Sequence, residues 1–228
     1  MAEEKDYIGH RQRLKERFLR GHGQDMADYE MLELLLTLAI PRKDTKPLAK
    51  ALINEFGSFA GVMGADENTL MSFSGLKESS ILVFSIVKEA ALRMTWQNLC
   101  AADSPIISNW DAMIDYCRMK MAHKTREEFM LIFLDAKLKV IGQDVQQRGT
   151  TDNVAIHPAE VVKSAIFNNA KSVIMVHNHP TGVVTPSKAD ILVTKQIFTA
   201  LQSVDIKLQD HIIVGKDECY SFRDTGLF

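Results

Sequence analysis

The sequence is poor in cysteine, and it contains no long apolar run. Its 228 residues include three cysteines, Cys100, Cys117 and Cys219, an odd number at wide spacing. This pattern indicates neither a disulfide framework nor a thiolate metal site, so we expect buried, unreactive thiols. No stretch approaches the roughly eighteen apolar residues of a membrane helix, and the N-terminus lacks the basic and apolar regions of a signal peptide. We therefore expect a cytoplasmic protein that does not bind membranes.

An excess of charge of either sign is also missing. The 27 Lys and Arg residues against 29 Asp and Glu residues give a net charge of −2, divided evenly between residues 1–98 and 99–228. Neither half has the bulk positive charge of a typical nucleic-acid-binding domain. With 46% hydrophobic and 25% charged residues, the composition predicts an ordinary globular protein, long enough for one large domain or two small ones.

Apolar residues recur at helical spacing throughout residues 1–98, which predicts a domain made only of helices. Proline and glycine at Pro41 and Gly57 mark two of the helix ends. The helices that we predict span residues 8–20, 26–40, 44–57 and 59–63, then one that opens around residues 66–67, and a long one at 78–96. The first is a basic amphipathic helix. Such a helix usually presents a solvated face, and contact with phosphate is the less common alternative.

The segment 70–77, between the last two of these helices, resembles a helix-hairpin-helix turn. In such turns the backbone N–H groups of a glycine-rich bend bind phosphate. Gly75 occupies one glycine position, whereas Lys77 stands where a second glycine is expected and supplies a cation instead. A plain turn between two helices fits these residues equally well. Gly75 and Lys77 are thus candidate nucleic-acid contacts, and we expect any DNA binding through residues 1–98 to be weak and salt-sensitive.

Residues 99–108 contain Ala-Ala-Asp-Ser-Pro and are the predicted linker to a mixed α/β domain at 105–228. Helices are expected from Ser108 to Met121, from Pro158 to Asn169 and from Ser187 to Leu201. The strands that we expect span residues 127–135, 137–147, 172–176, 207–214 and 219–222. Strands and helices in this mixed order suggest a three-layer α/β/α sheet.

Two histidines follow the apolar strand 172–176. Side chains two residues apart on a strand point the same way, so the spacing aims His177 and His179 at one place. Thr185 and Pro186 are typical of a helix N-cap followed by proline at the first helical position. We therefore expect Asp190 to lie close to the first turn of a helix.

Two imidazoles and one carboxylate, with the fourth position left to water, are the ligand pattern of catalytic zinc, whereas structural zinc sites are closed by four ligands. The alternative is that His177 and His179 are polar turn residues and that Asp190 only complements the positive end of a helix. The preceding buried strand and the following helix start favour the metal site.

At these residues the sequence resembles a known family. His-x-His, seven residues, Ser, two residues and Asp is similar to the signature of the JAMM (MPN-type) metalloproteins, and His-Asn-His-Pro-Thr-Gly resembles the RadC branch. Further stretches that carry the resemblance are Phe133-Leu134-Asp135, Arg148-Gly149-Thr150, the segment 157–162 and the segment 210–215. The resemblance implies a cytidine-deaminase-like three-layer fold, preceded by a small helical domain with a helix-hairpin-helix-like turn.

The resemblance also implies site residues. JAMM enzymes use a glutamate at the start of an early strand as general base, which here is Glu127 or Glu128. We predict Glu127, because RadC relatives resemble Glu-x-Phe at this position, and strand alternation lets only one of the two face the metal. Ser187 would donate a hydrogen bond to the developing oxyanion, with capping of the helix as its alternative role.

Two other histidines are assigned lesser roles. His211 enters the apolar run Ile212-Ile213-Val214, so we expect a core histidine or an orienter of a ligand rather than a fourth ligand. His157 precedes a helix-opening proline and is expected to be a turn residue.

Three classes of function remain. The ligand set favours a zinc-dependent hydrolase of peptide or isopeptide bonds, in which Zn2+ activates a water molecule and the substrate is a peptide or protein. The alternative is a DNA-associated repair or recombination factor of the RadC type, supported by Lys77 and the basic first helix. A scaffold without catalysis is the third class, and the intact ligand set argues against it.

Overall fold

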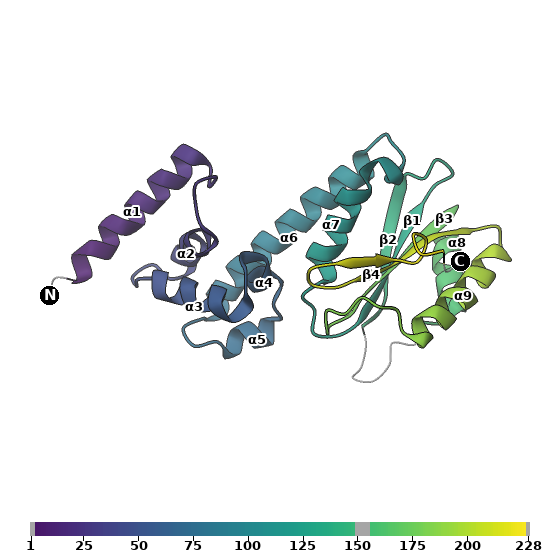
Figure 1. Ribbon diagram of the computed structural model, residues 1–228. Coiled ribbons are helices and arrows are strands. Elements are labelled where there is room, and N and C mark those ends of the chain that lie inside the picture. Colours follow the sequence, from purple (N-terminus) through teal and green to yellow (C-terminus); the bar gives the residue numbers. More distant parts are fainter. Residues whose placement is uncertain (1–2, 149–155, 227–228) are drawn as a thin grey trace. The chain divides into compact units, whose positions relative to one another are not determined.

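A mixed sheet organises the second half of the chain, and helices alone build the first half. The computed structural model describes residues 3–148 and 156–226 (Figure 1). The chain divides into two compact units, residues 1–91 and 92–228. Of the stretch Arg148-Gly149-Thr150, the last two residues lie outside the described part. No helix in the described ranges combines the length and apolarity of a membrane span.

Helices form the first unit, as the apolar spacing predicts. They are α1 (Glu3–Gly21), α2 (Asp28–Ala39), α3 (Lys46–Phe56), α4 (Phe59–Gly64), α5 (Glu67–Ser72) and the first part of α6 (Glu78–Ala101). Leu32, Leu36, Leu52 and Phe84 are almost fully buried and form the centre of its core. Burial of such side chains contributes about 1.5–3 kcal/mol each, which makes this the stabilising core of the unit.

In the second unit, the last part of α6, a short 3-10 helix and a further helix precede the sheet, and two helices connect its strands. The elements are η1 (Ile106–Asn109), α7 (Trp110–Met121), β1 (Glu128–Leu134), β2 (Val140–Arg148), α8 (Pro158–Phe167), β3 (Ser172–Asn178), α9 (Lys188–Gln202), β4 (Lys207–Val214) and β5 (Cys219–Ser221). The strand order is β2-β1-β3-β4-β5, and only the β3–β4 pairing is parallel among the described residues. All seven residues of β3 are buried, which agrees with the apolar run at residues 173–176.

The sheet is covered on both faces, which makes the predicted three layers. Alternate residues of β1, such as Met130 and Ile132, pack on one face with residues of α7 and the C-terminal part of α6. Phe129, Leu131 and Phe133 pack on the other face with residues of α8 and α9. Figure 1 shows α7 beside one face of the sheet and α8 and α9 beside the other.

Several boundaries differ from the sequence prediction, and two of them bear on the domain border and the candidate site. Helix α6 runs without interruption to Ala101, so the first three residues of the expected linker 99–108 are helical. The helix after the histidines begins at Lys188, and Ser187 is its N-cap instead of Thr185. Two reciprocal hydrogen bonds favour Ser187 as the N-cap. Its side chain accepts from the backbone N–H of Asp190, and the Asp190 carboxylate accepts from the backbone N–H of Ser187.

Candidate metal centre

The candidate centre lies where β3 ends and α9 begins. His177 is the last residue but one of β3. It pairs with Phe129 of β1, on the face of the sheet that α8 and α9 cover. Its Nε2 atom lies 3.0 Å from Nε2 of His179 and 3.4 Å from Oδ1 of Asp190. His179 Nε2 lies 3.5 Å from Asp190 Oδ2. Within residues 3–148 and 156–226, these three residues are the one group whose side chains could hold a metal ion.

The protons of the site can be placed from its carbonyl contacts. His179 Nδ1 lies 2.6 Å from the carbonyl oxygen of Val183. A carbonyl only accepts, so Nδ1 carries the proton, and in the neutral ring Nε2 carries a lone pair. That lone pair faces a second imidazole nitrogen and a carboxylate. Such a convergence of acceptors is stable only with a cation between them, either a proton or a metal ion.

The ionisation of the group agrees with this requirement. The hydrogen bond with Asp190 raises the pKa of His179, against the opposing effect of burial. Burial alone would raise the pKa of the Asp190 carboxyl, but its hydrogen bonds with His177, His179 and Ser187 outweigh burial and hold that pKa well below its usual range. The carboxylate is therefore charged at neutral pH, as a metal ligand must be.

The spacing of the three side chains suits a small tetrahedral ion. Zinc bonds of about 2.0–2.1 Å in tetrahedral geometry place neighbouring ligand atoms about 3.3–3.4 Å apart. The two Nε2 atoms are 3.0 Å apart, and each lies 3.4 or 3.5 Å from one of the two oxygens of the Asp190 carboxylate, so the separations bracket this value. The residues present therefore fit a metal held by two imidazole nitrogens and a carboxylate oxygen.

Ser187 lies beside the carboxylate of the group. Its hydroxyl donates to Asp190 Oδ2 at 2.6 Å, and its backbone N–H donates to the same oxygen at 2.7 Å. Ser187 caps α9, which is one of the two roles considered from the sequence. Its exposed hydroxyl also lies next to the candidate metal ligands, which is compatible with the other role, donation to an oxyanion.

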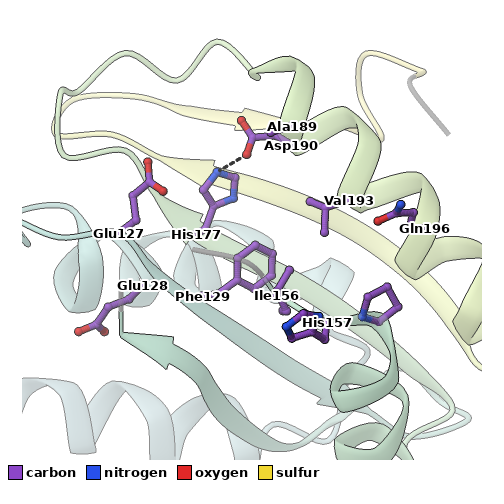
Figure 2. A pocket seen from close by; sticks show the side chains of 11 residues that line it. Glu127, Glu128, Phe129, Ile156, His157, His177, Ala189, Asp190, Val193 and Gln196 are labelled. Carbon is purple, nitrogen blue, oxygen red and sulfur yellow. Dashed lines mark ion pairs between the residues drawn. The ribbon is translucent and has the colours of Figure 1, made fainter. Parts of the chain in front are cut away.

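Glu127, which directly precedes β1, and Glu128, the first residue of β1, point in different directions. The Glu128 carboxylate pairs with Lys124, and the Glu128 backbone N–H donates to Oδ1 of Asn178, the last residue of β3. Glu127 shares the face of Phe129 and His177 by strand alternation. Figure 2 shows the side chains of Glu127 and His177 extending to the same side and that of Glu128 directed away from them. The charge of Glu127 also contributes to the raised pKa of His179.

A cavity of about 400 Å³ opens beside the group (Figure 2). Phe129, Ile156, Pro158 and Val193 give it apolar walls. Its remaining lining comprises Glu127, Glu128, His157, His177, Ala189, Asp190 and Gln196. His157 is exposed and is the N-cap residue of α8. It also lines the cavity.

His211 contacts His177, and both roles considered from the sequence, core histidine and orienter of a ligand, are compatible with its place. It lies on β4, is fully buried, and its Nε2 atom is 2.7 Å from His177 Nδ1. Burial lowers the pKa of His211 well below its usual range, with a smaller contribution from His177. Thr194 on α9 lies 2.6 Å from the other nitrogen of His211. Sequence reasoning missed Thr194, because no motif marks it.

The candidate nucleic-acid contacts lie in the first unit. Gly75 has a positive φ of 96° in the turn between α5 and α6, and Lys77 follows it as an exposed side chain. The basic residues of α1 are used in part within the unit. Arg11 donates to the carbonyls of Ile40 and Lys43 at the end of α2, and Arg17 pairs with Glu30. These contacts reduce the cations that α1 offers to phosphate.

The sequence is similar to a known protein family and to a known relative. A family model described as the RadC-like JAB domain matches residues 107–227. The chain is also similar to a UPF0758 protein of Rhodobacter capsulatus, with 44% identity over 214 residues. That alignment covers 94% of this chain and 99% of the relative. The similarity therefore includes the helical unit as well as the sheet and the candidate metal centre.

Proposed function

The chain belongs to the RadC-like JAB-domain family, and from this premise we propose that it is a zinc-dependent hydrolase of peptide or isopeptide bonds. The observation that carries the proposal is the convergence of two imidazole Nε2 atoms and one carboxylate within about 3.5 Å of each other. Three N and O ligands with an open fourth position are typical of catalytic zinc, whereas structural zinc is closed by a fourth ligand.

His177, His179 and Asp190 would hold the zinc ion. When bound, zinc lowers the pKa of a water molecule toward about 7 and polarises the carbonyl of the substrate. The protein supplies the remaining groups. Glu127 lies on the face of the sheet that carries His177, and we assign it the general base that accepts the proton of the attacking water and returns it to the leaving amine.

Ser187 would donate to the oxygen of the reacting carbonyl as negative charge develops there. Its hydroxyl bonds to Asp190 in the structure, and rotation about one bond redirects the proton. The backbone N–H of Ser187 still holds the carboxylate in that state. The cavity beside the group gives the substrate an apolar binding surface formed by Phe129, Ile156 and Val193.

Metal analysis tests the first half of the proposal. We expect about one zinc ion per chain in the purified protein and almost none in the His177→Ala/His179→Ala double variant. His157→Ala is the matched control, because His157 lines the same cavity without belonging to the converging group. It should retain zinc. Equal zinc content in the double variant and the wild type would refute the site.

Hydrolysis is tested with a library of peptides and isopeptide-linked substrates. Zinc-loaded wild-type protein should cleave members of the library, and the metal-free double variant should not. Zinc binding without cleavage of any member would remove the hydrolase assignment and leave a metal-binding protein of another function.

A further inference from the structure

A chain of hydrogen bonds leads from one candidate metal ligand to another through two side chains that bind no metal. His177 Nδ1 contacts His211 Nε2 at 2.7 Å, and His211 Nδ1 contacts Thr194 Oγ1 at 2.6 Å. Thr194 Oγ1 in turn lies 2.5 Å from the backbone carbonyl oxygen of Asp190. We propose that His211 and Thr194 are positioning residues, which hold His177 in the one tautomer that can bind a metal through Nε2. The inference rests on the metal half of the proposed function.

The direction of the chain is set at its Asp190 end. A backbone carbonyl oxygen accepts hydrogen bonds and cannot donate them, so the contact with Asp190 requires the hydroxyl proton of Thr194. A threonine hydroxyl has one proton. Thr194 Oγ1 must therefore act as the acceptor in its contact with His211, and Nδ1 of His211 must carry the proton.

The proton on His211 then sets the state of His177. His211 is fully buried, and its ring packs against the aromatic rings of Phe222 and Phe129 at centroid distances of 4.6 and 5.5 Å. A neutral imidazole has one N–H, so Nε2 of His211 is an acceptor. His177 donates to it from Nδ1. The Nε2 atom of His177 is left with its lone pair, aimed at His179 and Asp190.

The opposite direction is disfavoured by the same contacts. If Thr194 donated to His211, its oxygen would face the carbonyl oxygen of Asp190 at 2.5 Å with no proton between them. Thr194 is 1% exposed, so water does not relieve this repulsion. A buried polar group without a hydrogen-bond partner destabilises the arrangement that leaves it so. This series of hydrogen bonds therefore couples the tautomer of His177 to the backbone carbonyl of Asp190.

Three variants on α9 test the role of Thr194. Thr194→Val keeps the side-chain shape and removes the hydroxyl, Thr194→Ser keeps the hydroxyl, and Thr199→Val is the matched control. The Thr199 hydroxyl donates in the same way to the carbonyl oxygen four residues earlier, that of Lys195, at 3.0 Å, but Thr199 is exposed. Affinity is measured with Zn2+ and Co2+ in competition with a chelator, and the visible spectrum of bound Co2+ reports ligand geometry.

We expect Thr194→Val to weaken metal affinity by about ten- to a hundredfold, the usual effect of losing a group that orients a ligand. Its Co2+ spectrum should change. Thr194→Ser should restore most of the affinity, and Thr199→Val should match the wild type. Wild-type affinity in Thr194→Val would overturn the positioning role and leave the metal site itself standing.

The tautomers of the two histidines can also be measured in the wild-type protein, so this test does not depend on whether the variants fold. In ¹⁵N NMR spectra of metal-free protein with labelled histidine, His211 and His177 should both show the tautomer protonated at Nδ1. A His211 ring protonated at Nε2 would overturn the inference. Wild-type protein that bound no metal would instead refute the proposed function, and the two failures are therefore distinguishable.

Discussion

Individual side chains of the candidate centre are each held by a contact outside the converging group. His179 donates from Nδ1 to the carbonyl of Val183, and Asp190 accepts two bonds from Ser187. His177 is nearly fully buried and stacks on Phe129, with a ring separation of 5.4 Å. Little side-chain freedom remains to be lost when a metal binds, which favours binding.

Glu127 is the residue whose replacement tests catalysis most directly. Glu127→Gln keeps the shape of the side chain and removes its basicity, so we expect wild-type zinc content and thermal stability. Peptide or isopeptide cleavage should fall by about a hundredfold or more, which is the contribution expected of a general base. Steady-state rates with zinc-loaded protein provide the measurement.

Glu128→Gln is the matched control, one residue away. Its carboxylate pairs with Lys124 instead of facing His177, and loss of such a pair costs less than about 1 kcal/mol. Activity should stay close to wild type. An inactive Glu128→Gln beside an active Glu127→Gln would move the base by one residue, and full activity in both variants would remove the glutamates from the mechanism.

At the scale of elements, the start of α9 serves both folding and the site. Ser187→Ala removes the N-cap side chain, which should lower the free energy of unfolding by about 1 kcal/mol. Turnover should also fall, because the oxyanion donor is lost. We expect zinc to remain bound, since the backbone N–H of Ser187 still supports Asp190. Thermal unfolding, zinc analysis and turnover together separate these effects.

Ser58→Ala provides the comparison for this prediction. Ser58 caps α4 in the same way, accepting from the backbone N–H of Gly61 at 3.0 Å, but it lies in the other unit. Its loss should lower stability to a similar extent and leave turnover unchanged. Unchanged turnover in Ser187→Ala would contradict the oxyanion role, and release of zinc would show that Ser187 acts mainly by holding Asp190.

The elements show how far sequence alone determines this fold. The apolar run 172–176 predicted β3, and Pro158 predicted the start of α8, because both signals are local. The N-cap of α9 was wrongly placed at Thr185, since Ser187 prevails only through its reciprocal bonds with Asp190. Thr194 could not be recognised, because its partner His211 lies on β4 and meets α9 only in the folded sheet.

For the whole molecule, helix α6 contributes to two cores. Its first part belongs to the unit that ends at Ala91, where Phe84 is buried. Its last part packs with the second unit through Leu92, Trp96 and Leu99. The Trp96 and Tyr116 ring centroids are 5.1 Å apart. We therefore propose that an independent second domain starts at residue 92, earlier than the predicted 105.

Two truncated proteins test this boundary. A fragment of residues 92–228 should fold cooperatively, whereas a fragment of residues 105–228 lacks the apolar side chains of α6. Loss of a buried leucine such as Leu99 costs about 2–5 kcal/mol, and loss of a tryptophan costs a comparable amount. Because domains are stable by only about 5–15 kcal/mol, the shorter fragment should be partly unfolded at 25 °C. Urea denaturation followed by circular dichroism measures the difference.

Two substitutions within the 92–228 fragment separate packing from chain length. Trp96→Ala should lower the free energy of unfolding by about 3 kcal/mol, because the ring packs against Tyr116 and the core beneath the sheet. Met94→Ala lies on the same helix, but Met94 is 66% exposed, so it should change stability by less than about 0.5 kcal/mol. Equal stability of the two truncated proteins, together with a neutral Trp96→Ala, would place the boundary at 105 after all. Reduced stability in Trp96→Ala alone makes the last turns of α6 part of the fold that carries the candidate metal centre.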